Sequence, residues 1–381
     1  MASNISPATK LLKSLVAIPS VNPAFAQTGD QVGGEEGLVA FLESWATQRK
    51  LPVSFQKVAA GRRNILIRLP PKKRVQNRIV LAPHMDTVTV DSADALIPQI
   101  QGERLYGRGA CDTKGSIAAF LTALANLQRG PNRPESTEIV FVGLVDEENE
   151  QLGSRYFAEK YSKKIDLAIV GEPTFNKVVT AHKGDVWLEL ETIGKSAHGA
   201  NPHLGDNAVT QMARIVSLIE GPYAQKLAKI THPLLGSPTV NVGTIRGGTQ
   251  PNIVPHQCVI RLDRRTLPGE SMSTVKKELI NLLNKAGLKA RFRPARAAEC
   301  RALETDPNQA FVPSLMAAAK QKAVIGVDYF CDASHLSAGG IPSVVFGPGK
   351  IAQAHTREEW ISLRSLDRGV QILTRFLSSL P

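Results

Sequence analysis

Three short apolar runs in the first half of the chain have the length and composition of buried β-strands. They lie at residues 79–82, 139–142 and 167–170, and each is rich in β-branched residues. A longer stretch of good helix formers at residues 116–127 lies between the first two runs and predicts a crossover helix. Strands that alternate with helices predict an α/β domain with a doubly wound sheet that is buried on both faces.

The pattern changes in the middle of the chain. From Trp187 to Glu191 apolar and polar residues alternate, which predicts a half-exposed antiparallel strand. The elements predicted after it are a helix at 207–219, strands at 240–245 and 258–263, a helix at 273–285 and a strand at 288–292. The order βαββαβ is that of a ferredoxin-like domain. We therefore expect this α+β domain at residues 185–293, inserted into an α/β domain formed by residues 1–184 and 294–381.

Acidic residues and a histidine follow the ends of the three apolar runs. His84 and Asp86 come after the first run, Glu147 and Glu148 after the second, and Glu172 after the third. Taken singly, each motif is more often an ordinary turn or surface segment. The carboxyl ends of strands in such a sheet form its ligand site, however, and carboxylates gathered there repel one another unless a counter-charge is present. Together they predict a site for two divalent metal ions.

The motifs also occur together in a known family. The matching stretches are His84–Val88, Gly107–Gly115, Asp146–Glu148, Gly171–Thr174 and Phe346–Gly349 followed by His355-Thr356. With these stretches in this order over nearly its whole length, the chain resembles the co-catalytic zinc amidohydrolases and exopeptidases. That family includes acetylornithine deacetylase, succinyl-diaminopimelate desuccinylase, aminoacylase and glutamate carboxypeptidase.

The resemblance implies a set of metal ligands. His84, Asp112 and Glu172 would bind one metal ion. Asp112, Glu148 and His355 would bind the other, so that Asp112 bridges the two. Mixed carboxylate and imidazole ligands suit Zn²⁺, and Co²⁺ or Mn²⁺ are the alternatives. We therefore expect two Zn²⁺ ions as cofactors.

The resemblance also assigns residues that act on the water and on the amide. Asp86 would accept the other ring N–H of His84 and fix its tautomer. Glu147 would be the general base. His198, in the stretch Gly194–Pro202 that matches the family's lid signature, would donate to the oxyanion, often in the partner subunit.

Two further positions match those that hold the substrate carboxylate in the family. They are Asn252 and Arg265, and a planar guanidinium suits a bidentate contact with a carboxylate. Arg264, next to Arg265, leaves the choice between the two arginines open.

The function implied is hydrolysis of the amide bond of an N-acyl amino acid, as in acetylornithine deacetylase or succinyl-diaminopimelate desuccinylase, by a water that two Zn²⁺ ions activate. The alternatives are a glutamate carboxypeptidase or dipeptidase, and a non-catalytic metal-binding protein on the same fold. The inserted domain would serve as lid and dimerisation domain of a homodimer. A related aminopeptidase group shares the two-metal domain but lacks such an insert, so the block from Trp187 to Phe292 weighs against that group.

The composition of the chain limits the classes of binding partner that we expect. The 381 residues carry a net charge of +12, yet aromatic residues are only 5% and the basic residues are spread along the chain. We therefore expect carboxylated small molecules or short peptides as partners and no nucleic acid. No apolar run is long enough to span a membrane. Four cysteines without a Cys-x-x-Cys pair favour a reducing cytoplasm.

Overall fold

A computed structural model describes residues 5–25, 33–90, 92–296 and 298–381. Contacts divide the chain into two compact units. The first unit contains residues 1–180, 305–325 and 331–381, and the second contains residues 181–304 and 326–330. The division differs from the expected boundaries in that residues 181–184, 294–304 and 326–330 also belong to the second unit. Within that unit Leu303 pairs with His182, and Lys183 donates its N–H to Val327.

The first unit is built on a mixed sheet. Its strands are β1 (Val53–Ala59), β2 (Arg62–Leu69), β3 (Asn77–Ala82), β6 (Thr137–Gly143), β7 (Leu167–Val170) and β15 (Ser343–Val345). They lie in the order β1-β2-β6-β3-β7-β15, in which β6, β3, β7 and β15 run parallel and β1 and β2 form an antiparallel hairpin. The three predicted apolar strands are thus confirmed, and all seven residues of β6 are buried.

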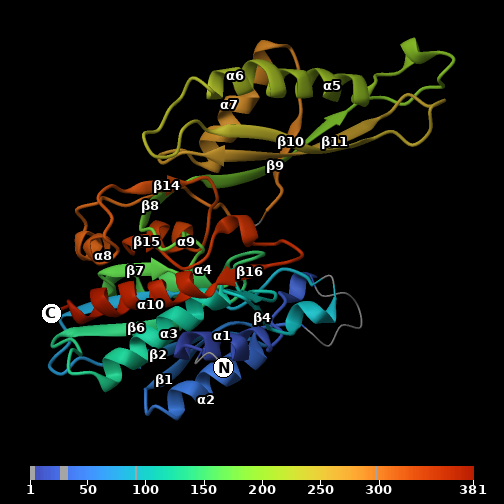
Figure 1. The fold of residues 1–381 in the computed structure, drawn as a ribbon. Coiled ribbons are helices and arrows are strands. Elements are labelled where there is room, and N and C mark those ends of the chain that lie inside the picture. Colours follow the sequence, from blue (N-terminus) through green and yellow to red (C-terminus); the bar gives the residue numbers. More distant parts are fainter. Residues whose placement is uncertain (1–4, 26–32, 91, 297) are drawn as a thin grey trace. The chain divides into compact units, whose positions relative to one another are not determined.

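Helices cover both faces of this sheet. Helix α3 (Lys114–Arg129) connects β3 to β6, and α4 (Leu152–Tyr161) lies between β6 and β7. Since β6 and β7 flank β3 on opposite sides, right-handed crossovers place α3 and α4 on opposite faces. Helix α3 packs against α1 (Pro7–Val16) and α10 (Leu363–Ser378), and α4 contacts α9 (Ala333–Ala338). The predicted doubly wound α/β architecture is confirmed (Figure 1).

Smaller elements complete the first unit. Helix α2 (Glu36–Thr47) packs on β2, and α8 (Val312–Ala318) packs on α10. Strand β16 (Trp360–Ser362) pairs with β5 (Arg104–Tyr106), which also pairs with β4 (Gln99–Gln101). The pairing of β16 with β5 brings Glu359 close to the loop that carries Asp112.

The second unit is a ferredoxin-like βαββαβ domain, as predicted. Its elements are β9 (Gly184–Ile193), α5 (Ala208–Leu218), β10 (Thr239–Gly247), β11 (Gln257–Thr266), α7 (Met272–Lys285) and β12 (Arg291–Pro294). The antiparallel strands have the order β10-β11-β9-β12. The last strand begins at Arg291 rather than at the predicted residue 288, because Gly287 has a positive φ and Leu288 donates its N–H to Leu283 at the end of α7.

Apolar side chains on one face of the second sheet form that unit's core. Leu188, Leu190, Ile260 and Leu262 are buried, and they cluster with residues of the helices such as Met212, Ile215 and Leu279. The alternation predicted for β9 is therefore real, with Trp187 on the exposed face. In the described part of the chain no helix is both long and apolar enough to cross a bilayer. All four cysteines are buried and free.

Candidate active site

Five side chains meet at one end of the parallel strands of the first unit. His84 follows β3, and its Nε2 lies 3.1 Å from Oδ1 of Asp112 and 3.8 Å from Oε1 of Glu172, which follows β7. Nε2 of His355 lies 3.3 Å from Oδ2 of Asp112 and 3.1 Å from Oε2 of Glu148. Each oxygen of Asp112 thus faces one imidazole. All five residues expected as metal ligands are brought together.

These residues fit a pair of divalent metal ions. His84, Asp112 and Glu148 offer ligand atoms that all lie within 4.8 Å of one another. Oε1 of Glu172 is buried and has no hydrogen-bond partner among the described residues. A carboxylate oxygen buried in this way is costly unless a cation compensates it. Mixed imidazole nitrogen and carboxylate oxygen donors are those that Zn²⁺ and similar ions bind.

The electrostatics of the cluster show how strongly its negative charge needs compensation. Burial, reinforced by the charge of Asp112, raises the pKa of Glu172 well above its usual value. Burial also raises the pKa of Glu148. Burial would raise the pKa of Asp112 as well, but hydrogen bonds from His355 and His84 hold it below its usual value. Contacts with Asp112 and Glu148 raise the pKa of His355 to about 10. Positive charge placed among these carboxylates would stabilise their ionised forms.

Asp86 holds the backbone of the acidic loop after β6. Its carboxylate accepts the N–H groups of Glu147 (3.0 Å) and Glu148 (3.1 Å) and the amide of Asn22 (2.7 Å). The expected contact with His84 differs in detail. Nδ1 of His84 lies 2.9 Å from the main-chain carbonyl of Asp86 and 3.5 Å from its carboxylate. The carbonyl is therefore the nearer acceptor, since the carboxylate oxygens already accept three other N–H groups.

A buried polar network behind Asp86 was not predicted. Asn22 also donates to Oδ1 of Asp146 (3.0 Å), a residue with φ of 70°. Arg62 donates to the same oxygen (2.6 Å) and forms a two-pronged ion pair with Glu35. Because these partners come from distant parts of the chain, no local pattern marks them. Together they fix the turn that presents Glu147 and Glu148.

Glu359 holds the loop that carries Asp112 and was also missed. Its carboxylate accepts the N–H groups of Gly109 (3.0 Å), Cys111 (2.8 Å) and Asp112 (2.9 Å), and Nη1 of Arg108 lies 2.9 Å away. In the sequence Glu358-Glu359 has the appearance of a solvated acidic pair. Only the pairing of β16 with β5 explains why Glu359 is 3% exposed.

The second unit brings together two of its three predicted site residues. His198 is exposed, and its Nδ1 accepts the N–H of Ala200 at 3.1 Å. The N–H of Gly199 donates to the carbonyl of Asn252 at 2.7 Å, so His198 and Asn252 lie in adjacent loops. Arg265 lies near the other end of β11, where both of its donor groups contact the carboxylate of Asp263 at 3.0 Å.

The two neighbouring arginines differ in burial. Arg264 is fully buried; it donates to the hydroxyl of Tyr223 at 3.3 Å and forms an ion pair with Glu270. The side chain of Arg265 keeps 29% of its surface exposed. Of the two, Arg265 is the one that a ligand can reach.

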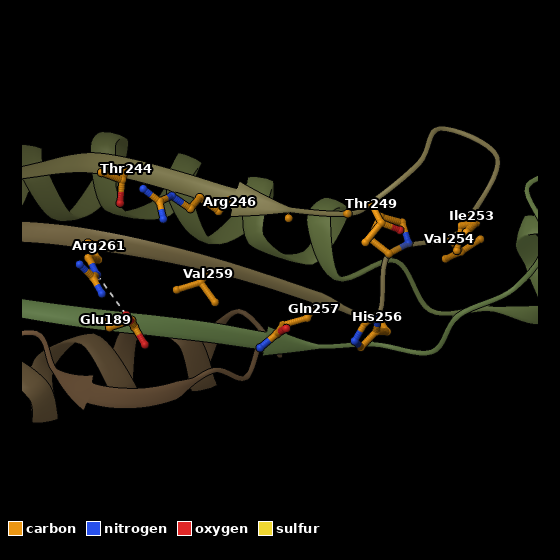
Figure 2. A pocket seen from close by; sticks show the side chains of 13 residues that line it. Glu189, Thr244, Arg246, Thr249, Ile253, Val254, His256, Gln257, Val259 and Arg261 are labelled. Atoms are coloured by element: carbon orange, nitrogen blue, oxygen red, sulfur yellow. Dashed lines mark hydrogen bonds and ion pairs between the residues drawn. The ribbon is translucent and has the colours of Figure 1, made fainter.

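A hollow of about 400 Å³ lies on the exposed face of the second sheet. Figure 2 shows side chains of β9, β10 and β11 around it, with Arg261 paired with Glu189 at 3.1 Å. The loop at 247–256 closes one end. None of the described residues that line it is a predicted site residue. The hollow therefore adds nothing to the metal cluster, although Asn252 lies in the bordering loop.

Comparison with known proteins agrees with this geometry. Residues 80–379 match Peptidase family M20/M25/M40. An acetylornithine deacetylase of Vibrio cholerae serotype O1 is 28% identical, and the alignment covers 96% of each chain. One of Aliivibrio salmonicida is 30% identical over 90% of this chain and 91% of that protein.

Solved structures share the fold over the whole chain. Aminopeptidase PepT from Bacillus cereus has a TM-score of 0.78 at 21% identity and covers 98% of this chain and 97% of its own. The M20 family metallo-carboxypeptidase from Sulfolobus solfataricus has a TM-score of 0.74 at 20% identity, with 98% and 99% covered. The match to an aminopeptidase includes the inserted domain. The fold, with its inserted domain, is therefore shared with an aminopeptidase.

The role of Glu359 gives a testable prediction. We expect Glu359→Gln to weaken metal binding about 10–100-fold, because residues that orient metal ligands typically contribute that much. The glutamine side chain has one oxygen that accepts and an NH₂ group that only donates. It therefore cannot accept all three backbone N–H groups of residues 109–112 that the carboxylate of Glu359 accepts. Zn²⁺ affinity measured by competition with a chromophoric chelator would show the change. Glu358→Gln is the matched control, and equal affinity in both variants would contradict the role.

Proposed function

The chain belongs to Peptidase family M20/M25/M40, and from that premise we propose that it removes the acyl group of an N-acyl amino acid with two Zn²⁺ ions at the cluster around Asp112. It is a hydrolase of linear amides that depends on metal ions. The observation that carries the proposal is the meeting of both imidazoles on one carboxylate, which is the arrangement a bridging ligand requires.

The contacts support the proposed set of metal ligands. His84 and Glu172 would bind one ion and Glu148 and His355 the other, with one oxygen of Asp112 directed to each. Bound divalent ions supply Lewis acidity, which makes water acidic near neutral pH and stabilises negative charge on the amide oxygen. Zn²⁺ is proposed, and Co²⁺ or Mn²⁺ would suit the same donors.

Glu147 is proposed as the general base. It is the neighbour of Glu148, but its carboxylate accepts the amide N–H of Gln151 at 3.1 Å. The two N–H groups held by Asp86 fix the backbone at both glutamates. Glu147 would take a proton from the attacking water and pass it to the departing amine. This role needs a carboxylate that stands beside the metal ligands without being one of them.

The second unit is proposed to be the lid and the dimerisation domain of a homodimer. Strand β10 is an edge strand of nine residues with exposed side chains over most of its length, which is a surface suited to pairing. His198 and Asn252 lie beyond one end of β11, while Arg265 is near the other, roughly 25 Å away at 3.3 Å per residue. Figure 2 shows Ile253 at the end of the sheet far from Arg261. One small substrate cannot touch both ends of one lid, which supports contributions from two subunits.

The substrate class rests on the relatives and on charge. Acetylornithine deacetylases among the relatives support an N-acyl amino acid. The net charge of +12 and the exposed guanidinium of Arg265 favour a substrate with a free carboxylate. A dipeptidase or a glutamate carboxypeptidase is the second candidate, because a metallo-carboxypeptidase has the same fold. A non-catalytic role is not supported, since the chain retains each expected ligand and the base.

The proposal is tested by amine release from a panel of N-acetyl and N-succinyl amino acids and dipeptides. Metal-free protein is assayed with and without added Zn²⁺ or Co²⁺. We expect metal-dependent release that is fastest for an N-acyl amino acid. Glu147→Gln should keep its metal content and lose at least about two orders of magnitude in turnover, which is what a general base contributes. Fastest release from dipeptides would favour a dipeptidase or carboxypeptidase. Full activity of Glu147→Gln would show that Glu147 is not the general base.

His198 gives a prediction for the lid. Because its ring is exposed and accepts the N–H of Ala200, two residues away, we expect His198→Ala to fold with nearly unchanged stability. Turnover should fall about 100-fold or more if the ring donates to the oxyanion. The measurement is kcat and KM beside thermal unfolding, with the nearby exposed His203→Ala as control. Wild-type turnover in His198→Ala would return this residue to a purely structural role.

A further inference from the structure

Two buried polar side chains lie directly behind Glu147. Gln151 is 1% exposed, and its Nε2 donates to Oε1 of Glu147 at 3.1 Å. The oxygen of the same amide lies 2.9 Å from Nε2 of His335, which is 9% exposed. The three residues form a short chain of hydrogen bonds that ends on one oxygen of the glutamate.

The fold fixes this chain at both ends. Gln151 precedes α4 in a left-handed conformation with φ of 54°. Its N–H donates to the carbonyl of Asp146 at 2.6 Å, and its carbonyl accepts the hydroxyl of Ser154 at 3.1 Å. His335 lies on α9, which packs against α4. The amide therefore has little freedom to move away from Glu147.

The direction of the hydrogen bonds is set by the carboxylate of Glu147, which can only accept. A glutamine side chain presents an oxygen at one side and an NH₂ group at the other. Nε2 of His335 can face the amide oxygen only as an N–H donor, and this leaves the NH₂ group for Glu147. With the amide reversed, its oxygen would face the carboxylate oxygen of Glu147, and that contact would be lost. The observed orientation keeps both contacts when His335 carries its proton on Nε2.

The contact engages one oxygen of Glu147 and leaves the other available. A general base must present an oxygen lone pair to the water along a defined direction, and small misplacements of reacting groups are expensive in rate. A glutamate side chain has three rotatable bonds, which burial alone does not fix in one rotamer. The hydrogen bond from Gln151 fixes that rotamer, while Asp86 holds only the backbone of the same residue.

We propose that Gln151, oriented by His335, is a positioning residue that holds Glu147 in its reactive rotamer. The inference rests on the proposed role of Glu147 as base. It concerns neither the metal ligands nor the binding of substrate. Loss of the contact should therefore lower kcat and leave KM and metal content unchanged.

The test is Gln151→Leu, which removes the hydrogen bond and keeps a similar volume. We expect kcat to fall about 10–100-fold, the usual effect of losing a partner that orients a functional group. Gln151→Met is made in parallel, in case leucine does not fold. Gln56→Leu is the matched control, because Gln56 is a buried glutamine that bonds to α4 through the carbonyl of Tyr156. The control should keep wild-type kcat while it loses comparable stability.

A double-mutant cycle separates positioning from a general structural effect. In the Glu147→Gln background, Gln151→Leu should lower kcat by less than twofold, because there is no longer a base to position. His335→Phe should lower kcat in the wild-type background and have no further effect in Gln151→Leu. A structural defect would instead reduce turnover by the same factor in every background.

The outcomes separate this inference from the proposed function. If Glu147→Gln is inactive and both Gln151 variants keep wild-type kcat, the positioning role is overturned and the base stands. Equal loss in Gln151→Leu and in the Gln56→Leu control also overturns it. If Glu147→Gln itself keeps full activity, the proposed base fails, whatever the Gln151 variants show.

Discussion

The structure depends on how several buried carboxylates tolerate one another at the end of one sheet. Parallel strands β3, β6 and β7 bring His84, Glu148 and Glu172 to one end of the sheet, and the loop before α3 adds Asp112. The imidazoles of His84 and His355 both face Asp112. Burial raises the pKa of both glutamates, whereas the two histidines lower that of Asp112. Such a cluster is stable with positive charge in its centre and costly without it. Two divalent cations would answer that constraint, and they would supply the Lewis acidity that amide hydrolysis needs.

Residues around the cluster hold its carboxylates in place by binding the backbone of the loops that carry them. Asp86 and Glu359 each accept several main-chain N–H groups and thereby hold the two loops that carry Glu148 and Asp112. Neither residue is a proposed metal ligand, and each acts by holding the backbone of a loop. A ligand set placed by loops gains its precision from such contacts, because each anchors peptide groups on both sides of the functional residue. Gln151 extends this support from the backbone to the side chain of Glu147.

The sequence predicted most of the architecture, because burial patterns are local signals, and the family resemblance named the five residues that the structure brings together. The apolar composition of a run such as residues 79–82 predicts a buried strand. The order of the strands then predicts where the histidine or acidic residue after the run will lie. Asn22, Arg62 and Glu359 could not be predicted, since each looks ordinary in sequence and acts through partners far along the chain. The same reason moved the expected boundary at residue 293: segment 294–304 returns to pair with β8 (Val179–His182). The preference of His84 Nδ1 for a carbonyl also depends on geometry alone.

The most direct test of the account is the metal content of the protein and of Asp112→Asn after equilibrium dialysis against Zn²⁺, measured by atomic emission. Asp112 faces both histidines, so a bridging role requires that one substitution disturb both sites. We predict about two ions per chain for the native protein and a loss of both in Asp112→Asn at concentrations that saturate the native site, because the shared ligand serves both ions. Two ions retained by Asp112→Asn, in a folded chain, would contradict the central role of this carboxylate.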